Sequence, residues 1–432
     1  MAPALINLPT AMILPAIYVE YTAVTLTTIG LVNLFRWWFD AVSDPAVGYL
    51  SDRWVSRGGS RKPWVVGGAM IAAVSAYFLF QPPAEAGALF YAMGLMGVYL
   101  GFTCFSISHT SWGSEIAVDY DDRSRISMYF SVFTILGSLA IWLIPLALYP
   151  FTGSLAMTPG VMTVLAWVIL LVLPGTTLIA SLFVPAGTRM SVQNTTLREA
   201  AATLRGNRLL HRYIVAVMIW GIGQGINLSL IFIFLRDYLE LGDWFPVLMI
   251  VYFSVQTVSM PFWKWAMTRW GKHRPWAASW VIGAILTPFI LLVEPGALGI
   301  VLALISLQAF VTGGSYIGPV AILGDIADYS LLKTGANSTG ILFSFKSLLE
   351  KANFGVGAAI AFPVLGWFGY EVGGTNDGTA NLGLILLFVV VPSFTATLAA
   401  AVLWNFPLDE RRHGIVRRRI EQRAERTAAA AV

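Results

Sequence analysis

The chain has 432 residues, of which 57% are hydrophobic and only 12% are charged. Its mean hydropathy is +0.72, a composition that identifies a polytopic membrane protein. The net charge of +4 does not indicate a nucleic-acid partner, because the basic residues are distributed as topology signals. A single cysteine, Cys104, and four scattered histidines exclude an internal disulfide, a thiolate metal cluster and a metalloenzyme site. We therefore expect no enzyme and no organic cofactor.

About twelve apolar segments of roughly 20 residues follow one another along the chain, each long enough to cross a hydrocarbon core of about 30 Å as a helix. The first segment lacks a basic leader and a small-residue cleavage site, so we expect it to be a retained helix. The sequence predicts an all-α membrane protein of twelve transmembrane helices. The predicted segments lie near residues 5–29, 31–50, 64–80, 88–117, 125–149, 161–184, 212–235, 244–268, 275–293, 297–323, 336–368 and 381–406.

The basic residues predict the orientation. All but four of the 27 Lys and Arg lie in alternate connections or in the tail. By the positive-inside rule, both termini are cytoplasmic, and the protein is a multi-pass protein of the cell (inner) membrane. The Arg-rich tail, residues 407–432, is predicted to be a solvated, lipid-facing segment in contact with anionic headgroups.

The chain contains an internal repeat. Residues 56–64 and 268–276 share basic residues followed by Pro-Trp at an offset of 212, and residues 113–120 resemble 324–329 at an offset of about 210. Six helices have therefore been duplicated. This pattern predicts an N-terminal bundle, 1–184, a cytoplasmic linker, 185–211, and a C-terminal bundle, 212–406, with substrate bound near the midplane.

Two carboxylates in the second segment indicate a cation site. Asp40 and Asp44 lie one helical turn apart in an apolar segment, so both face the same way in a setting where isolated charges are costly. One alternative is a structural clamp with Arg36, one turn earlier. A single Arg cannot neutralise two carboxylates, however, and Ser43 adds a hard oxygen ligand. The sequence leaves open whether the cation is sodium or a proton.

The eleventh segment carries three charges. Lys346 and Glu350 are spaced to neutralise each other on one helical face. Lys351 then remains, and we expect it to face Asp40 and Asp44 across the central cavity, where its ammonium would compete with a coupling cation.

Other polar side chains are candidates for the solute cavity. A polar run in the fourth segment includes Ser106 and His109, and His109 is either a proton relay or a hydrogen-bonding packing residue. Glu20 is either a cavity acid or an interface residue at the outer end. Trp112 and the second-half amides Gln224, Asn227 and Gln256 are further candidates to bind solute or to join helices.

The repeated basic loops predict a cytoplasmic gate. Arg side chains there can bind helix C-terminal carbonyls and carboxylates, and such contacts would break and re-form as the halves rock. The alternative is that these residues only set orientation. The predicted gate residues are Asp52, Arg53, Arg61, Glu115, Arg269 and Asp325.

Several motifs together carry a family resemblance. They are Asp40-Ala-Val-Ser-Asp44-Pro45 with Gly48, Arg61-Lys-Pro-Trp64, Gly113-Ser-Glu115, Asp119-Tyr-Asp-Asp-Arg123, Gly324-Asp-Ile-Ala-Asp-Tyr329 and Gly366-Trp-Phe-Gly-Tyr370. The chain resembles the glycoside-pentoside-hexuronide:cation symporters, the melibiose permease-like branch of the major facilitator superfamily. The resemblance spans helices one to eleven and implies the major facilitator fold, solute–cation symport and a monomer.

The resemblance also assigns residues. It implies that Asp40, Ser43, Asp44 and Thr103 occupy the family's cation site, and that Lys351 is the family's helix-eleven lysine. Three positions depart from the family's sugar site. Asn7 and Ser106 replace its acids on helices one and four, and Phe130 replaces its arginine on helix five.

These departures leave two kinds of solute open. A neutral or differently substituted glycoside would be held by Asn7, Ser106, His109, Trp112 and the second-half amides. Alternatively, the solute is amphipathic, as in the sodium-dependent lysolipid transporters that resemble the same branch. A non-transporting sensor or scaffold would not need these intramembrane charges. The expected partners are a small-molecule solute and the lipid bilayer, with sodium or a proton as the coupling ion and no metal other than sodium.

Overall fold

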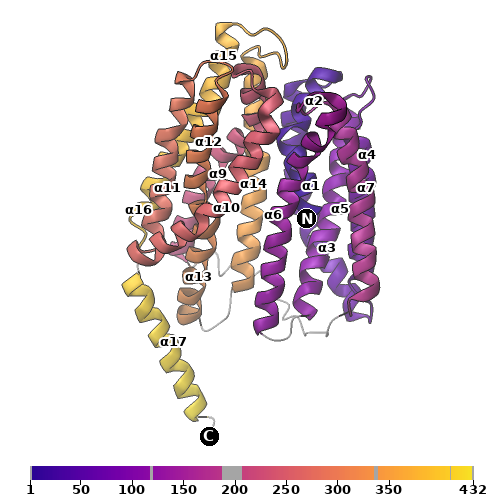
Figure 1. Cartoon of the computed structure of the whole chain (residues 1–432). Helices are drawn as coiled ribbons and strands as arrows, with labels where there is room; N and C mark the ends of the chain where they lie inside the picture. The colour runs from indigo at the N-terminus through magenta and orange to yellow at the C-terminus, as the bar shows by residue number, and fades with distance from the viewer. Residues whose placement is uncertain (1, 117–119, 187–206, 335–338, 409, 431–432) are drawn as a thin grey trace. The chain divides into compact units, whose positions relative to one another are not determined.

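The computed structural model describes residues 2–116, 120–186, 207–334, 339–408 and 410–430, and the regular secondary structure in these ranges is helical (Figure 1). The first part of the chain forms α1 (Ala2–Met12), α2 (Leu14–Tyr21), α3 (Leu26–Ser56), α4 (Lys62–Leu79), α5 (Ala88–Ile116), α6 (Tyr120–Thr152) and α7 (Pro159–Phe183). The later part forms α9 (Arg208–Ile233), η1 (Phe234–Tyr238), η2 (Gly242–Trp244), α10 (Phe245–Trp270), α11 (His273–Leu286), η3 (Thr287–Leu292), α12 (Leu298–Thr312), α13 (Gly314–Thr334), α14 (Thr339–Trp367), α15 (Gly378–Ile385), η4 (Leu386–Val390), α16 (Val391–Trp404) and α17 (Glu410–Ala430).

Among the described residues, ten helical spans are long and apolar enough to cross a membrane. The predicted all-α membrane fold is therefore confirmed. Neither α1 nor α2 is long enough by itself to count among the ten spans. The helix α3 is long enough, but its charged residues, including Asp40 and Asp44, make it too polar to be counted. Adding the α1–α2 pair and α3 would give twelve, which stays a prediction.

The first predicted boundary is wrong. The chain leaves α2 after Tyr21, and α3 begins at Leu26 rather than near residue 31. The reason is an N-cap: Thr25 has extended backbone, and its hydroxyl accepts a hydrogen bond from the Thr28 N–H at 3.2 Å. This side chain satisfies one of the free N–H groups of the new helix and fixes its start.

The chain folds into two compact units. Unit 1 comprises Met1–Val192, Leu228–Phe253 and Ala358–Ile385. Small residues hold α4 and α5 together: a Cβ on Gly101 would lie 2.2 Å from the Ala72 nitrogen, and one on Gly68 would lie 2.4 Å from the Phe105 nitrogen. Such close backbone contact is how helices associate where water does not drive them together. The helix α5 also packs against α3. This contact positions the face of α3 that carries the charged residues.

Unit 2 comprises Gln193–Asn227, Ser254–Gly357 and Leu386–Val432. Its core lies where α11 packs against α16, with Trp276 completely buried and Trp280 stacked on Trp220 at 5.3 Å between ring centroids. The tail helix α17 packs on α13, and its Val416 is buried. The prediction of a solvated tail is therefore wrong for this part of α17.

The predicted domain boundaries remain untested. Most of the predicted linker, 185–211, lies outside the described residues. Its end is described: α9 begins after Asn207, whose side-chain oxygen accepts hydrogen bonds from Leu209 N at 3.1 Å and Leu210 N at 3.2 Å. The bundles 1–184 and 212–406 stay a prediction.

Candidate functional site

One face of α3 carries the charged residues. Its buried positions, Arg36, Asp40, Ser43, Val47 and Ser51, recur every three or four residues and so form one stripe. This stripe lies on a helix that packs against α5. Helical periodicity gathers these polar side chains on one face of α3, and the packing of α3 on α5 brings that face toward polar side chains of α5.

The predicted cation ligands lie together on these two helices. Thr103 of α5 donates a hydrogen bond to Asp44 Oδ1 at 2.8 Å. Asp40, one turn earlier on α3, is 1% exposed, and Ser43 between the two carboxylates is 8% exposed. Within the part of the chain that the structure describes, the buried Ser43 hydroxyl has no hydrogen-bond partner. We call Asp40, Ser43, Asp44 and Thr103 the α3–α5 site.

Arg36 is the neighbouring cation. Its Nη1 lies 3.6 Å from Asp40 Oδ2, and its guanidinium lies over the Tyr99 ring at 4.0 Å from the centroid. A tight charge-assisted hydrogen bond is about 2.7–2.9 Å long, so this ion pair is loose. The predicted alternative, an Arg36 clamp, thus applies to Asp40 in this structure, whereas Asp44 is bound by Thr103.

The α3–α5 site has the chemistry of a hard-cation site. Two carboxylates and two hydroxyls from α3 and α5 present oxygen atoms, the ligand type that hard cations take. Ser43 supplies a buried oxygen that a bound cation would satisfy. The same carboxylates could instead take a proton.

The predicted first-half solute residues lie in unit 1. The side-chain oxygen of Asn7 on α1 is buried and has no hydrogen-bond partner among the described residues. His109 of α5 stacks on Phe105 at 5.2 Å and lies 6.4 Å from the ring of Phe130 on α6. Ser106 is half-buried. Phe130 is 50% exposed, so an aromatic surface stands at the position where the resemblance expected an arginine.

Other predicted cavity residues have partners of their own. The Trp112 ring N–H donates to the Pro185 carbonyl at 2.9 Å. In unit 2, Asn227 donates to the Phe388 carbonyl at 3.2 Å and Gln256 donates to the Thr312 hydroxyl at 3.1 Å. The Asn227 and Gln256 contacts join helical segments, and the Trp112 contact joins α5 to the chain after α7. A solute role for these residues stays a prediction.

On α14, the predicted pair is confirmed: Lys346 Nζ lies 2.5 Å from Glu350 Oε1. Gln224 and Lys351 are half-buried. Their predicted roles, including the competition of Lys351 with a coupling cation, stay predictions.

The predicted gate residues of the first half form a cluster. Arg61, 3% exposed, donates to Glu115 Oε1 at 2.6 Å, to Asp52 Oδ1 at 2.7 Å and to the Ser51 hydroxyl at 3.2 Å. We call these residues the Arg61 cluster. Arg53 lies outside it, because its guanidinium is exposed and contacts Tyr49.

The second half has a related cluster whose basic members the sequence did not predict. Asp325 binds Lys272 at 2.5 Å, and His413 of α17 lies 3.3 Å from Asp325 and 2.9 Å from Asp328. The predicted Arg269 is exposed. A signal for Lys272 existed, since it lies one position from the residue that aligns with Arg61 at the repeat offset of 212. No repeat signal exists for His413, because it belongs to the tail.

Comparison with known proteins decides the family. The family described as "MFS/sugar transport protein" matches residues 1–410. The chain belongs to this family. Family membership confirms the predicted resemblance, the predicted fold class and the predicted class of function, a membrane transporter.

Relatives within the family differ in what their names describe. The chain is 23% identical to the glucuronide carrier protein homolog of Escherichia coli, covering 93% of this chain and 89% of that protein. It is 24% identical to sodium-dependent lysophosphatidylcholine symporter 1-A of Danio rerio, covering 87% and 77%. Among solved structures, the nucleoside transporter NupG superposes with a TM-score of 0.67 at 13% identity, covering 94% and 96%, which shows a shared fold.

Proposed function

We propose that this protein is a secondary active transporter that couples the movement of a small organic solute to sodium or a proton. The observation that carries the proposal is the α3–α5 site, in which Asp44 accepts from Thr103 and Ser43 has a buried hydroxyl beside two carboxylates. Family membership supplies the transport class. Electrostatics then explains the coupling. If the solute-loaded protein changes conformation only when the charges of the α3–α5 site are neutralised, the solute crosses the membrane only together with its cation.

Arg36 gives the α3–α5 site a built-in counter-charge. In the cation-free protein, the loose pair with Asp40 keeps part of the buried negative charge neutralised. A monovalent cation that enters between Asp40 and Asp44 adds a second positive charge to that of Arg36, and together the two cations balance the two carboxylates. The site is then fully neutral only when it is loaded, which lowers the cost of moving the loaded protein between conformations.

The first candidate solute is a sugar or glycoside without a strict need for charged contacts. The buried side-chain oxygen of Asn7, which has no partner among the residues that the structure describes, can accept from a hydroxyl, and the half-buried Ser106 can donate and accept. A glucuronide carrier homolog among the relatives supports this class. Melibiose-like galactosides are not expected, since each hydrogen bond to a charged group contributes about 1.5–3 kcal/mol and these groups are absent.

The second candidate solute is amphipathic. Phe130 is 50% exposed and continues the ring contacts of His109 and Phe105, so an apolar surface is available where a sugar site would carry a charge. A lysophosphatidylcholine symporter among the relatives supports this alternative. The aromatic surface would contact acyl carbon, and the α3–α5 site would still supply the coupling.

The proposal includes the orientation. The basic loops support an orientation with both termini in the cytoplasm. The proposal also includes a monomer in the inner membrane. Epitope tags at residue 1, within 190–206 and at 432 should be protected in intact cells, and a tag within 371–379 should be accessible. Accessibility of the 190–206 tag from outside would overturn this orientation.

Uptake into proteoliposomes tests the function. Neutral glycosides, glucuronides and lysophosphatidylcholine are offered with an inward sodium gradient, an inward proton gradient or no gradient. We expect one class to accumulate only when one of the gradients is imposed. Glycoside accumulation would support the first candidate, and accumulation of the lysolipid alone would support the second. Equal uptake of the solute with and without gradients would sink the coupling proposal.

A further inference from the structure

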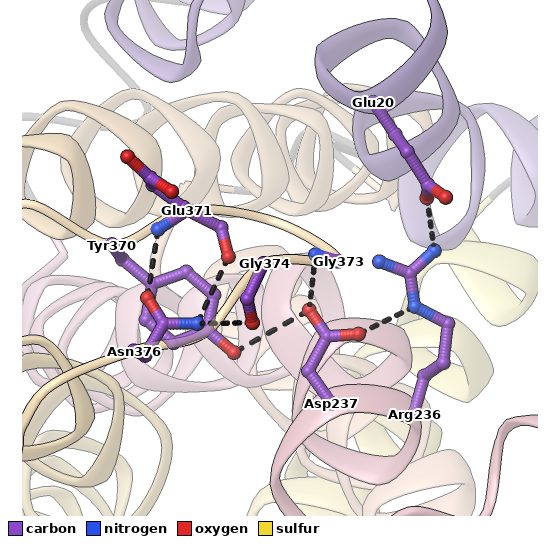
Figure 2. A network of polar contacts seen from close by, with 8 residues as sticks. All are labelled: Glu20, Arg236, Asp237, Tyr370, Glu371, Gly373, Gly374 and Asn376. Carbon is purple, nitrogen blue, oxygen red and sulfur yellow. Dashed lines mark hydrogen bonds and ion pairs between the residues drawn. The ribbon is translucent and has the colours of Figure 1, made fainter.

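A polar network joins three distant segments at one end of unit 1 (Figure 2). Glu20 near the end of α2 binds Arg236 Nη1 at 2.6 Å, and Arg236 Nε binds Asp237 Oδ1 at 2.5 Å. The other Asp237 oxygen accepts from Gly373 N at 3.0 Å and from the Tyr370 hydroxyl at 3.4 Å. The network therefore links a helix of the predicted first half to two segments of the predicted second half.

The backbone is shaped to make these contacts. Arg236 and Asp237 lie in the π turn η1, which is closed by the hydrogen bond from Leu239 N to the Phe234 carbonyl at 3.1 Å. Isolated π turns in helices often occur at functional positions. Gly242 makes room for the arginine, because a Cβ there would lie 2.6 Å from Arg236 Cγ.

The segment after α14 has glycine where it meets the network. Gly373 has φ +73°, and a Cβ there would lie 3.2 Å from Glu20 Cδ and 3.4 Å from Arg236 Nη2. Asn376 holds this segment in place by accepting from Glu371 N at 2.8 Å and donating to the Glu371 carbonyl at 2.9 Å. The segment thus presents its Gly373 N–H to Asp237 with the backbone pressed against Glu20 and Arg236.

The network lies at the end of the helices opposite the Arg61 cluster. Tyr18, two residues before Glu20, donates to the carbonyl of Leu79 at 2.8 Å, and Leu79 is the last residue of α4, whereas Arg61 lies at the start of that helix. Near the start of α3, at this same end, a Cβ on Gly30 would lie 2.3 Å from Pro363 Cδ. A close apolar contact and the ionic network therefore lie at the same end.

We propose that Glu20, Arg236, Asp237, Tyr370 and Gly373 form a latch, the α2–η1 latch, that holds this end shut and must break before the solute path opens there. The inference rests on transport by alternating access. Its charges suit a reversible contact: Arg236 is 21% exposed and Glu20 is 28% exposed, so water can replace the pair when the helices separate.

Asp237 connects the two parts of the latch. Its carboxylate is 8% exposed and faces the arginine with one oxygen and the α14–α15 segment with the other. Burial raises the pKa of Tyr370, and the adjacent Asp237 carboxylate raises it further, so Tyr370 remains a protonated donor. Loss of Arg236 would break the contacts with both Glu20 and Asp237, whereas loss of Glu20 would leave the Arg236–Asp237–Gly373 part in place.

Cysteine labelling tests the latch without any solute. Replacement of the single cysteine by Cys104→Ala gives a background for one reporter, Leu26→Cys, since Leu26 is 5% exposed and lies beside Gly366 at the latched end. A water-soluble maleimide is added to the purified full-length protein, and the rate of labelling is measured. Because the reagent reaches both ends of the purified protein, the position of the reporter cysteine decides which end the labelling rate reports on. A second reporter, Ala76→Cys, lies in the core of α4 with 0% exposure.

We expect Arg236→Gln to speed labelling at position 26 by about five- to tenfold and Glu20→Gln by less, with no change at position 76. The matched control is Glu371→Gln, which removes an exposed carboxylate from the same segment without touching Arg236 or Asp237, and should leave both rates unchanged.

Unchanged labelling at position 26 in Arg236→Gln would overturn the latch. Equal acceleration at positions 26 and 76 would also overturn it, because the network would then be a general stabiliser of the fold. Neither result depends on finding a solute, so failure of the latch is distinguishable from failure of the proposed transport function.

Discussion

The same two helices, α3 and α5, hold two charged sites of different character. At their ends, Arg61 is bound at 2.6, 2.7 and 3.2 Å by Glu115, Asp52 and Ser51. Farther along the helices, Asp40 meets its arginine only at 3.6 Å. The Arg61 contacts with Glu115 and Asp52 are as short as tight charge-assisted hydrogen bonds, whereas the Arg36–Asp40 contact is longer. We interpret the Arg61 cluster as a clamp and propose the α3–α5 site as the place where the coupling cation binds.

The largest expected effect on cation binding is that of Asp44→Asn. This change removes one charge from the α3–α5 site while keeping the shape and the contact with Thr103. Cation-induced thermal stabilisation, measured over a sodium series and a pH series, should need about a hundredfold more cation. Asp52→Asn, an acid on the same helix in the Arg61 cluster, should keep the cation response. An unaltered response in Asp44→Asn would erase the distinction between the two sites.

Arg61→Gln should act on stability instead. It removes the guanidinium that contacts Glu115, whose side chain is 12% exposed, and breaking a buried ion pair typically costs about 3–5 kcal/mol. The thermal-unfolding midpoint should fall clearly, and the double variant with Glu115→Gln should recover part of the loss. The control Arg57→Gln changes an exposed residue of the same loop and should have no measurable effect. A wild-type midpoint in Arg61→Gln would mean that the cluster is not a clamp.

Thr103→Val should weaken cation binding by about tenfold. The substitution keeps the side-chain volume but removes the hydroxyl that donates to Asp44 at 2.8 Å, and a hydrogen bond to a charged group contributes about 1.5–3 kcal/mol. Thr103→Ser restores the hydroxyl and should restore most of the affinity. If Val and Ser behave alike in the same thermal-shift assay, the hydroxyl is not part of the site.

Arg36→Gln should have the smallest effect, and in the opposite direction. Removing the guanidinium at 3.6 Å takes away a positive charge that competes for Asp40, so the apparent affinity for the coupling ion should rise about fivefold. Arg36→Lys keeps the charge and should stay close to wild type. A weaker response in Arg36→Gln would show that the arginine orders the carboxylates rather than competing for them.

Much of the α3–α5 site could be predicted because helical periodicity places Asp40, Ser43 and Asp44 near one face of a single helix. The partnership of Arg61 with Glu115 was also within reach, since both belong to recognisable motifs. The start of α3 was missed because one N-cap hydroxyl, on Thr25, interrupts an otherwise continuous apolar run.

The α2–η1 latch could not be predicted. Glu20 and Arg236 are 216 residues apart, and only the tertiary fold brings them together. The π turn that carries Arg236 has no sequence signature of its own. His413 was missed for a related reason: its contact with Asp328 depends on where the tail helix packs. Local patterns specify helices and their faces, whereas such contacts depend on how distant helix ends meet.

The most direct test of cation coupling is the accumulation ratio of the transported solute in proteoliposomes under an imposed sodium or proton gradient. Wild-type protein is compared with the Asp40→Asn, Asp44→Asn double variant at equal amounts of folded protein. The account predicts that wild type concentrates the solute several-fold above the external level, and that the double variant at most equilibrates it. Concentrative, gradient-dependent uptake by the double variant would contradict the account and place the coupling site elsewhere.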